Sequence, residues 1–164
     1  MLAYTEMPSP IGRLRLVGDA AGLREVYLGA DDSELPVPDG WARDEVALRI
    51  AVEQFEAYFA GTRTVFTVPL AADGSAFQRR VWQALGTIPY GETISYAELA
   101  LRIGQPRAVR AVGRANATNP LPIVVPCHRV IGSSGALTGY GGGLDRKRWL
   151  LAHESASASG RPRE

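Results

Sequence analysis

The chain has 164 residues, 46% of them hydrophobic, a length that accommodates one domain or two small ones with an ordinary globular core. Its single cysteine excludes an internal disulfide and a cysteine-rich zinc site. No apolar run approaches the length of a transmembrane helix, and residues 1–16 lack the apolar core of a signal peptide. We therefore expect an intracellular, cytoplasmic protein.

Charge is distributed unevenly along the chain. Residues 1–75 contain 6 Lys/Arg and 12 Asp/Glu, a net charge of −6, whereas residues 76–149 contain 10 and 3, a net charge of +7. A basic second half suggests a surface for a polyanion. The alternative is that the asymmetry is incidental, and the charge count alone does not decide between the two.

The first half is predicted to be a small α/β support domain. Residues 14–17 and 23–28 form two apolar runs separated by turn-forming residues, which predicts a β-hairpin. Helical spacing of apolar residues predicts a helix over about 43–60, ended by Gly61, and a further strand is expected over 65–70. This half groups no nucleophile with a base or with metal ligands, so we expect it to support the rest of the chain.

The second half begins with three predicted helices. Capping-box patterns at Ser75 and Ser95 predict helices that end near residues 85 and 103. A third helix is expected over 106–116, starting at a proline after a Gly-containing connector. Two short helices around such a turn match the helix-turn-helix motif.

The third helix carries the strongest signal for DNA binding. Arg107, Arg110 and Arg114 are spaced i, i+3 and i+7, which places them within about 60° of one another on a helix. Val109 and Val112 are expected to point the opposite way, toward a core. An arginine stripe is often only a solvated face, but its place on the second helix of a helix-turn-helix favours a nucleic-acid contact.

The only cysteine lies in the segment Pro126-Cys127-His128-Arg129-Val130-Ile131-Gly132. The apolar residues 119–125 before it predict a buried strand, and Pro126 and Gly132 suit the start and end of a helical turn. Unpaired N–H groups at such a helix N-terminus favour a thiolate. Because His128 is the next residue, a bridging water between the two side chains is plausible. The alternative is a buried structural cysteine beside a surface histidine.

The remaining residues carry a glycine-rich segment and a helix. Residues 133–143 contain five glycines, which let the backbone pass close to a ligand. No Gly-Lys-Ser/Thr follows, so a phosphate loop is unsupported, and no strand–glycine–helix unit supports a nicotinamide or S-adenosylmethionine fold. A helix is expected from Asp145 to Glu154. Residues 155–164 contain no large apolar residue and are predicted to be a disordered tail.

Taken together, these segments resemble the O6-alkylguanine-DNA alkyltransferase family, also called methylated-DNA–protein-cysteine methyltransferases. The resemblance covers residues 76–154 in order and at matching spacing. It rests on the segments Phe77-Gln78-Arg79-Arg80-Val81-Trp82, Ile88-Pro89-Tyr90-Gly91-Glu92-Thr93, Ser95-Tyr96, Arg110-Ala111-Val112-Gly113, Asn119-Pro120, the cysteine segment, Gly139-Tyr140-Gly141-Gly142-Gly143-Leu144 and Leu150-Leu151-Ala152-His153-Glu154. In the first half only Ser9-Pro10-Ile11-Gly12 and Tyr58-Phe59-Ala60-Gly61 fit.

The resemblance implies an α/β (α+β) fold in two domains. The first, residues 1–72, would be a small RNase H-like α/β support domain, and the second, residues 73–154, a mainly helical DNA-binding and catalytic domain with a helix-turn-helix. The activity implied is direct and irreversible transfer of an alkyl group from O6-alkylguanine in DNA, with O4-alkylthymine left open as a second substrate. The implied partner is double-stranded DNA carrying this damage, and we expect a monomer with no membrane contact, no cofactor and no metal.

The resemblance also implies roles for single residues. Cys127 would be the nucleophile, His128 would take its proton through a water, and Glu154 would orient and polarise His128. Asn119 would support the turn around the cysteine, and Tyr96 would give a hydrogen bond or a proton to the leaving guanine.

The DNA and substrate contacts complete this set. One arginine, Arg110, would fill the place of the flipped nucleotide in the base stack. The other expected DNA contacts are Arg107, Arg114, Ser95 and Ala111. The residues expected to line the guanine pocket are Tyr96, Val130, Tyr140, Gly141 and Pro122.

The chemistry fits these residue types independently. Displacement at a methyl carbon needs a soft, ionised nucleophile, which a thiolate supplies. A base inside a duplex is unreachable and has to be flipped out. Because a thioether is a poor leaving group, the protein would act once.

The chain also departs from some relatives. Some carry a zinc bound by Cys and His in the first domain, but no Cys or His precedes Cys127 here. Asn116 stands where some relatives have a bulky apolar residue, and Gly141 replaces a hydroxyl residue, which leaves the accepted alkyl size open.

Two other classes of protein remain as alternatives. A DNA-binding regulator could use the helix-turn-helix with Cys127 as a sensor, but the sequence shows no clear dimer interface. A Cys–His hydrolase would need an oxyanion hole, and the direct adjacency of Cys127 and His128 is unusual for it.

Overall fold

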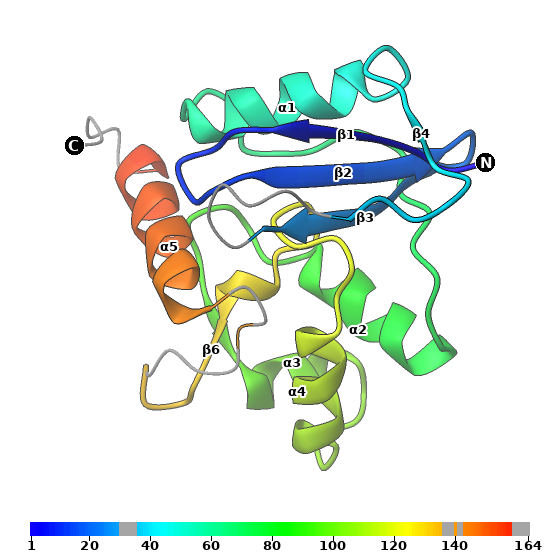
Figure 1. Ribbon diagram of the computed structural model, residues 1–164. Helices are drawn as coiled ribbons and strands as arrows, with labels where there is room; N and C mark the ends of the chain where they lie inside the picture. The colour runs from blue at the N-terminus through cyan, green and yellow to red at the C-terminus, as the bar shows by residue number, and fades with distance from the viewer. Residues whose placement is uncertain (30–35, 136–139, 141–142, 159–164) are drawn as a thin grey trace. The chain divides into compact units, whose positions relative to one another are not determined.

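The computed structural model describes residues 1–29, 36–135, 140 and 143–158. The chain divides into two compact units, Met1–Asp73 and Gly74–Glu164 (Figure 1). Gly141 and the end of the expected tail, residues 159–164, lie outside the described residues.

A four-stranded sheet forms the centre of the first unit. Its strands are β1 (Ala3–Met7), β2 (Leu14–Asp19), β3 (Gly22–Leu28) and β4 (Ala42–Arg43). The strand order is β3-β2-β1-β4. β2 is antiparallel to both β1 and β3, and β4 is parallel to β1. The predicted hairpin is confirmed as β2 and β3, whereas β1 and β4 were not predicted because each is too short or too polar to show a clear alternation.

Helix α1 (Arg49–Phe59) lies alongside this sheet (Figure 1). It begins later than the predicted residue 43 because Ala42 and Arg43 pair with β1 instead. Its buried face includes Phe55 and Tyr58, which are fully inaccessible to solvent. The helix therefore supplies the main aromatic core of the first unit.

The predicted strand over 65–70 is wrong. Only Leu70 forms an isolated bridge, with Leu23. The backbone N–H of Thr67 donates to the Gln54 side chain at 2.9 Å, and Gln54 donates back to the Thr67 hydroxyl at 2.6 Å. A side chain of α1 thus satisfies a backbone group that a strand would have paired in a ladder.

The second unit is mainly helical. Its elements are α2 (Ala76–Leu85), β5 (Ile94–Ser95), α3 (Tyr96–Arg102), α4 (Val109–Ala117), the 3₁₀ helix η1 (Cys127–Arg129), β6 (Val130–Ile131) and α5 (Leu144–Ala158). The capping box at Ser75 is confirmed, and the Ser95 hydroxyl accepts the Glu98 N–H at 3.0 Å. Strands β5 and β6 pair in parallel, which joins the start of α3 to the segment after the cysteine.

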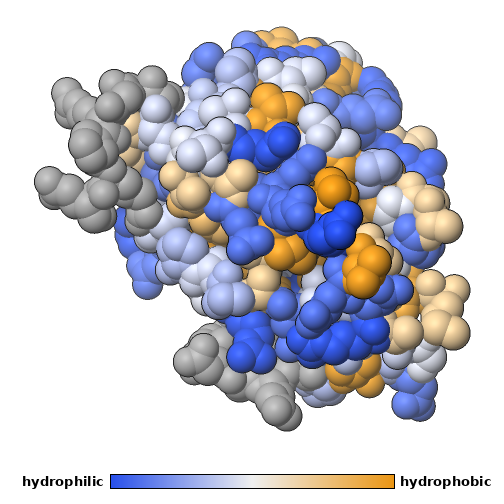
Figure 2. Space-filling model, turned by 90° about the horizontal axis from the view of Figure 1, so that it is seen from above, coloured by the Kyte–Doolittle hydropathy of each residue, from blue (hydrophilic) through white to orange (hydrophobic). Residues whose placement is uncertain are grey.

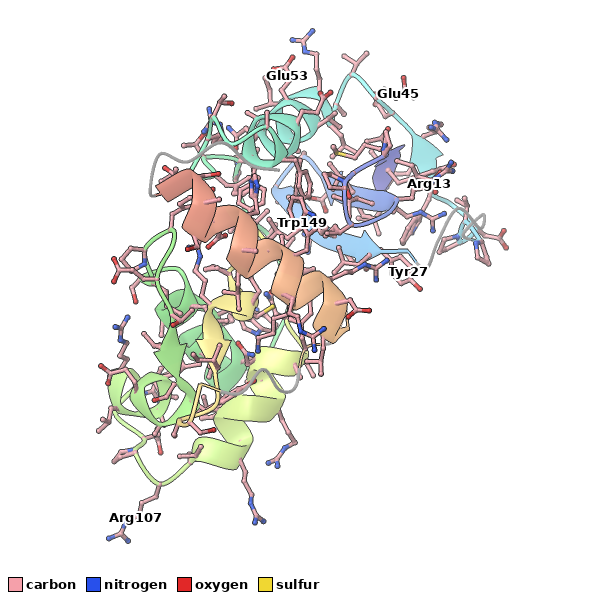
Figure 3. All side chains as sticks on the ribbon, turned by 90° about the vertical axis from the view of Figure 1, so that its left-hand side faces the viewer. Arg13, Tyr27, Glu45, Glu53, Arg107 and Trp149 are labelled. Atoms are coloured by element: carbon pink, nitrogen blue, oxygen red, sulfur yellow. The ribbon has the colours of Figure 1, made fainter. Side chains whose placement is uncertain are left out.

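The helix predicted over 106–116 begins only at Val109. Pro106 and Arg107 lie in the preceding turn, so Arg107 is not on the helix, and its side chain projects away from the ribbon (Figure 3). Val112 is buried as expected, but Val109 is 36% exposed. Only Arg110 and Arg114 of the predicted stripe share the helix face.

The segment 119–125 is a turn, and the strand predicted there is wrong. Pro122 and Val125 form an isolated bridge, and Ile123 adopts φ 77°. Prolines at 120 and 122 lack the N–H groups that a strand ladder needs. A β-branched residue in the left-handed region is strained by about 1–3 kcal/mol, so the residues around it must hold this turn in place.

The predicted disordered tail begins too early. Helix α5 continues to Ala158, so residues 155–158 are helical. These residues are Ser and Ala, which a helix tolerates once it is nucleated and packed upstream.

No helix among the described residues is long and apolar enough to cross a membrane. On the face shown in Figure 2, the exposed apolar side chains of described residues are interspersed with hydrophilic ones.

Candidate active site

Cys127 is the first residue of η1, directly after the strained turn. Its side chain is a free thiol and the residue is 5% exposed. Burial raises the pKa of the thiol to about 11, although a hydrogen bond from Asn119 and the charge of Lys147 act in the opposite direction. Burial thus opposes the thiolate that the sequence favoured, and a three-residue 3₁₀ helix offers few free N–H groups to offset the loss of water.

His128 lies in direct contact with Glu154. Its Nε2 is 2.7 Å from the Glu154 Oε2, and both side chains are almost completely buried. Burial lowers the pKa of His128, so the imidazole is neutral at rest. Because Nε2 faces a carboxylate, Nε2 carries the proton and Nδ1 is an acceptor. Among the described residues Nδ1 has no hydrogen-bond partner, so it is available to receive a proton.

Arg129 completes this network and was not predicted from the sequence. Its Nε and Nη2 donate to the two Glu154 oxygens at 2.8 and 3.0 Å, and its Nη1 donates to the Ile88 carbonyl at 2.7 Å. Burial alone would raise the pKa of Glu154, but the contacts with His128 and then Arg129 hold it well below its usual range. Glu154 is thus a carboxylate that accepts hydrogen bonds from His128, from Arg129 and, at 3.4 Å, from the Gly91 N–H.

Two asparagines hold the backbone around the cysteine. Asn119 accepts the Leu121 N–H at 2.9 Å and donates to the Val125 carbonyl at 2.7 Å, which closes the turn containing Ile123. Asn116, on α4, donates to the Cys127 carbonyl at 3.4 Å. The helix that carries Arg110 therefore also touches the backbone of the cysteine.

Lys147 is a second residue that the sequence reasoning missed. It is 0% exposed, and its Nζ donates to the Val130 carbonyl at 2.6 Å. The same Nζ lies 6.0 Å from the centre of the Tyr96 ring. A signal was present in the spacing, since Lys147 and Glu154 are seven residues apart and share one face of α5.

A groove of about 580 Å³ runs along α4 in the second unit. It brings Tyr96 together with Arg110 and Arg114, and Ser133 also lines it. A Cβ placed at Gly113 would make an ordinary van der Waals contact with the Tyr96 ring, at 3.9 Å, so α4 and this ring lie close together.

The other predicted residues lie around this groove and the cysteine. Ser95 caps α3, and Ala111 lies half-buried on α4. Val130 and Pro122 are buried beside the turn. Burial raises the pKa of Tyr140 well above its usual value, and its hydroxyl has no partner among the described residues.

Comparison with known families gives a consistent result for both halves of the chain. Residues 76–156 match the family described as 6-O-methylguanine DNA methyltransferase, DNA binding domain. Residues 2–72 match the 6-O-methylguanine DNA methyltransferase, ribonuclease-like domain.

Individual relatives agree. A methylated-DNA–protein-cysteine methyltransferase of Mycolicibacterium paratuberculosis is 56% identical over 94% of this chain and 93% of its own length. The crystal structure of the Mycobacterium tuberculosis O6-methylguanine methyltransferase has a TM-score of 0.87 and 51% identity, covering 100% of this chain and 97% of that one. A structure of Mycobacterium tuberculosis OGT in complex with DNA has a TM-score of 0.87 and 52% identity, covering 94% of both chains.

Proposed function

Since the chain belongs to the 6-O-methylguanine DNA methyltransferase family and repairs DNA by moving an alkyl group onto a cysteine, we propose that Cys127 accepts this group from O6-alkylguanine in duplex DNA. Cys127 is the only cysteine in the sequence. The observation that carries the proposal is the buried contact of His128 with Glu154 beside this thiol.

The reaction begins from a neutral thiol and a neutral imidazole. The thiol proton passes through a water to the His128 Nδ1, and the resulting imidazolium is stabilised by the Glu154 carboxylate. The sulfur then attacks the alkyl carbon, the carbon–O6 bond breaks, and its electron pair goes to the guanine. Tyr96 gives the leaving base a hydrogen bond or a proton. The product is a thioether on Cys127, so each molecule acts once.

The DNA contacts support the same proposal. The target base has to leave the duplex before a buried thiol can reach it. Arg110 is exposed on α4 and lines the groove with Tyr96, which suits a side chain that takes the place of the flipped nucleotide. Arg114, Arg107 and Ser95 are proposed to contact the backbone of the duplex.

The remaining parts of the proposal concern the pocket and the state of the protein. Val130, Tyr140, Pro122 and Gly141 are proposed to surround the flipped guanine. A protein that repairs DNA works in the compartment that holds it, so the cytoplasmic location stays part of this proposal. We also propose that the protein acts as a monomer.

The test is incubation with a duplex containing O6-methylguanine, followed by intact mass measurement. We expect a single gain of about 14 Da, one methyl group replacing one hydrogen, in the parent and none in Cys127→Ser. A duplex containing O4-methylthymine, used in parallel, tests the second substrate. A gain that persists in Cys127→Ser would overturn the assignment of the acceptor, and no gain with O6-methylguanine would overturn the assignment of the damaged base.

A further inference from the structure

The segment between α2 and β5 carries a sequence motif that the proposed reaction does not use. Residues 88–91 are Ile-Pro-Tyr-Gly, part of one of the segments on which the family resemblance rests. The Glu92 N–H donates to the Pro89 carbonyl at 3.1 Å, which closes a β-turn over residues 89–92. Gly91, at the third position of this turn, has φ 81°, a conformation that glycine adopts readily. The turn therefore holds its N–H groups and side chains in a defined direction.

Three residues of the 88–91 segment reach the pair formed by Arg129 and Glu154. The Ile88 carbonyl accepts a hydrogen bond from the Arg129 Nη1 at 2.7 Å. The Gly91 N–H donates to the Glu154 Oε1 at 3.4 Å. The Tyr90 ring lies with its centre 5.6 Å from the central carbon of the Arg129 guanidinium, the geometry of a cation–π contact. The segment thus contacts both members of the pair.

The pairing of β5 with β6 fixes the segment beside these residues. The two residues of β5 follow the turn, and they pair in parallel with the two residues of β6, which directly follow Arg129. The segment is therefore anchored at one end by the Ile88 carbonyl and shortly after its other end by strand pairing. It cannot move away from Arg129 without breaking one of these contacts.

The interactions of Glu154 depend on its orientation and on the exclusion of water. The Arg129 Nε and Nη2 bond to different oxygens of Glu154, which fixes the rotation of the carboxylate. The side chains of His128 and Glu154 are 0% and 1% exposed, and that of Arg129 is 8% exposed. Charges interact more strongly where water is excluded, because the local dielectric is low. A group that covers Arg129 therefore acts on the carboxylate that faces His128.

We propose that Tyr90 is a positioning residue for alkyl transfer: its ring covers the Arg129 guanidinium and so holds Glu154 in the orientation that stabilises a charged His128. Tyr90 acts through Arg129 and Glu154 and not on the substrate. This inference rests on the proposed function, because the role of Tyr90 is expressed in the step in which His128 receives the thiol proton.

Substitutions of Tyr90 separate the aromatic ring from its bulk. Tyr90→Phe keeps the ring and removes only the hydroxyl. Tyr90→Leu keeps an apolar side chain but removes the aromatic face over the guanidinium, and Tyr90→Met makes the same change with a more flexible side chain, for use if Tyr90→Leu folds poorly. Tyr27→Leu is the matched control, because Tyr27 is an exposed tyrosine of β3 in the first unit.

The readout is the rate of methyl transfer from a duplex containing O6-methylguanine, followed by intact mass and normalised to the folded fraction from thermal melting. Each substitution is measured in the parent and in Glu154→Gln, which forms a double-mutant cycle. A role through the carboxylate predicts that the effect of Tyr90 disappears once the carboxylate is removed. A ring that only packs would change the rate by the same factor in both backgrounds.

We expect Tyr90→Leu to slow transfer about tenfold in the parent background and less than about twofold in Glu154→Gln. Tyr90→Phe and Tyr27→Leu should stay within about twofold of the parent. An equal factor in both backgrounds, or a parent-like rate for Tyr90→Leu, would overturn the proposal while leaving the proposed function intact. A parent that transfers no methyl group would overturn the proposed function, and this inference with it.

Discussion

Two Arg–Glu pairs, one in each unit, share one feature: the arginine joins the carboxylate to a backbone carbonyl. In the first unit the Arg15 Nη2 lies 3.0 Å from the Glu6 carboxylate, and its Nη1 donates to the Pro36 carbonyl at 2.8 Å. In the second unit Arg129 donates to both oxygens of Glu154, and its Nη1 likewise donates to a backbone carbonyl, that of Ile88. Arg15 instead directs its Nε and Nη2 to one oxygen of Glu6. Each arginine thus fixes a carboxylate and a nearby segment of backbone.

The two pairs differ in the third partner of the glutamate. Glu6 is also bonded to Arg13, whose side chain is 38% exposed, and its own side chain is 13% exposed. The Glu154 side chain is 1% exposed, and in place of a second arginine it accepts a hydrogen bond from His128. A buried Arg–Glu pair is therefore no sign of catalysis in itself. What distinguishes the second pair is a neutral histidine with an open nitrogen beside the only cysteine.

The largest effect on methyl transfer is expected from replacing the cysteine itself. Cys127→Ser leaves both ion pairs intact but replaces the soft nucleophile with a hydroxyl that hardly ionises. We expect methyl transfer to be lost altogether, whereas affinity for duplex DNA should change little because Cys127 is buried away from the exposed arginines. Intact mass and a DNA-binding titration measure the two quantities. Substantial transfer by Cys127→Ser would show that the second network does not serve this residue.

The dependence of stability on pH should differ between Glu154 and Glu6. The folded-state pKa of Glu154 is depressed below the value of about 4.3 for an unfolded chain, so its contribution is complete above about pH 5 and is lost as the pH falls. Glu154→Gln leaves Arg129 buried beside a neutral amide and should lower the free energy of unfolding at neutral pH by about 3–5 kcal/mol. The free energy of unfolding of Glu154→Gln should also vary less between about pH 5 and lower pH than that of the parent.

Glu6→Gln is the matched control for that measurement. Because the Glu6 side chain is more exposed, we expect a smaller loss of stability. Urea titrations at several pH values between about 3 and 7 measure both variants. Equal losses of unfolding free energy in the two variants would mean that the pair with Glu154 stabilises the fold no more than the pair with Glu6.

A third comparison sets these buried arginines against an exposed one. If Arg110 enters the duplex in place of the flipped nucleotide, Arg110→Ala should make flipping less favourable by about 1–3 kcal/mol. Transfer from duplex DNA should then fall about ten- to a hundredfold. Reaction with the free base O6-benzylguanine needs no flipping and should hardly change, if the pocket admits it. An unchanged ratio of the two rates would reduce Arg110 to a phosphate contact.

The smallest effect is expected at Arg107. Arg107 lies in an exposed turn before α4 and not on the helix, so we expect it to contact the backbone of the duplex. Arg107→Ala should weaken DNA binding for all sequences and reduce the slope of log affinity against log salt by up to about one unit. Its ratio of duplex to free-base rates should equal that of the parent. A changed ratio would assign it a part in flipping.

The sequence predicted the parts of the site that depend on local patterns. Capping residues placed the starts of α2 and α3, and the cysteine segment with its resemblance identified Cys127, His128 and Glu154 as one group. The structure brings His128 and Glu154 into contact although 26 positions separate them. Their roles in the reaction stay predictions until the variants are measured.

The errors arise where tertiary contacts override local patterns. The segment 119–125 is apolar enough for a strand, but its prolines and the side chain of Asn119 close a turn. No role was predicted from the sequence for Arg129 or Lys147, because their partners, Glu154 and the Val130 carbonyl, lie 25 and 17 positions away. The burial of Cys127, which opposes its ionisation, was missed for the same reason, since burial cannot be judged from neighbouring residues alone.

The most direct test of the difference between the two ion pairs is the rate of methyl transfer itself. Glu6→Gln and Glu154→Gln are incubated with a duplex containing O6-methylguanine, and the gain in intact mass is followed in time and normalised to the folded fraction. We predict the parent rate for Glu6→Gln and a rate about a hundredfold lower for Glu154→Gln, because only the second carboxylate stabilises a charged histidine. Equal rates in the two variants, whether fast or slow, would contradict this account.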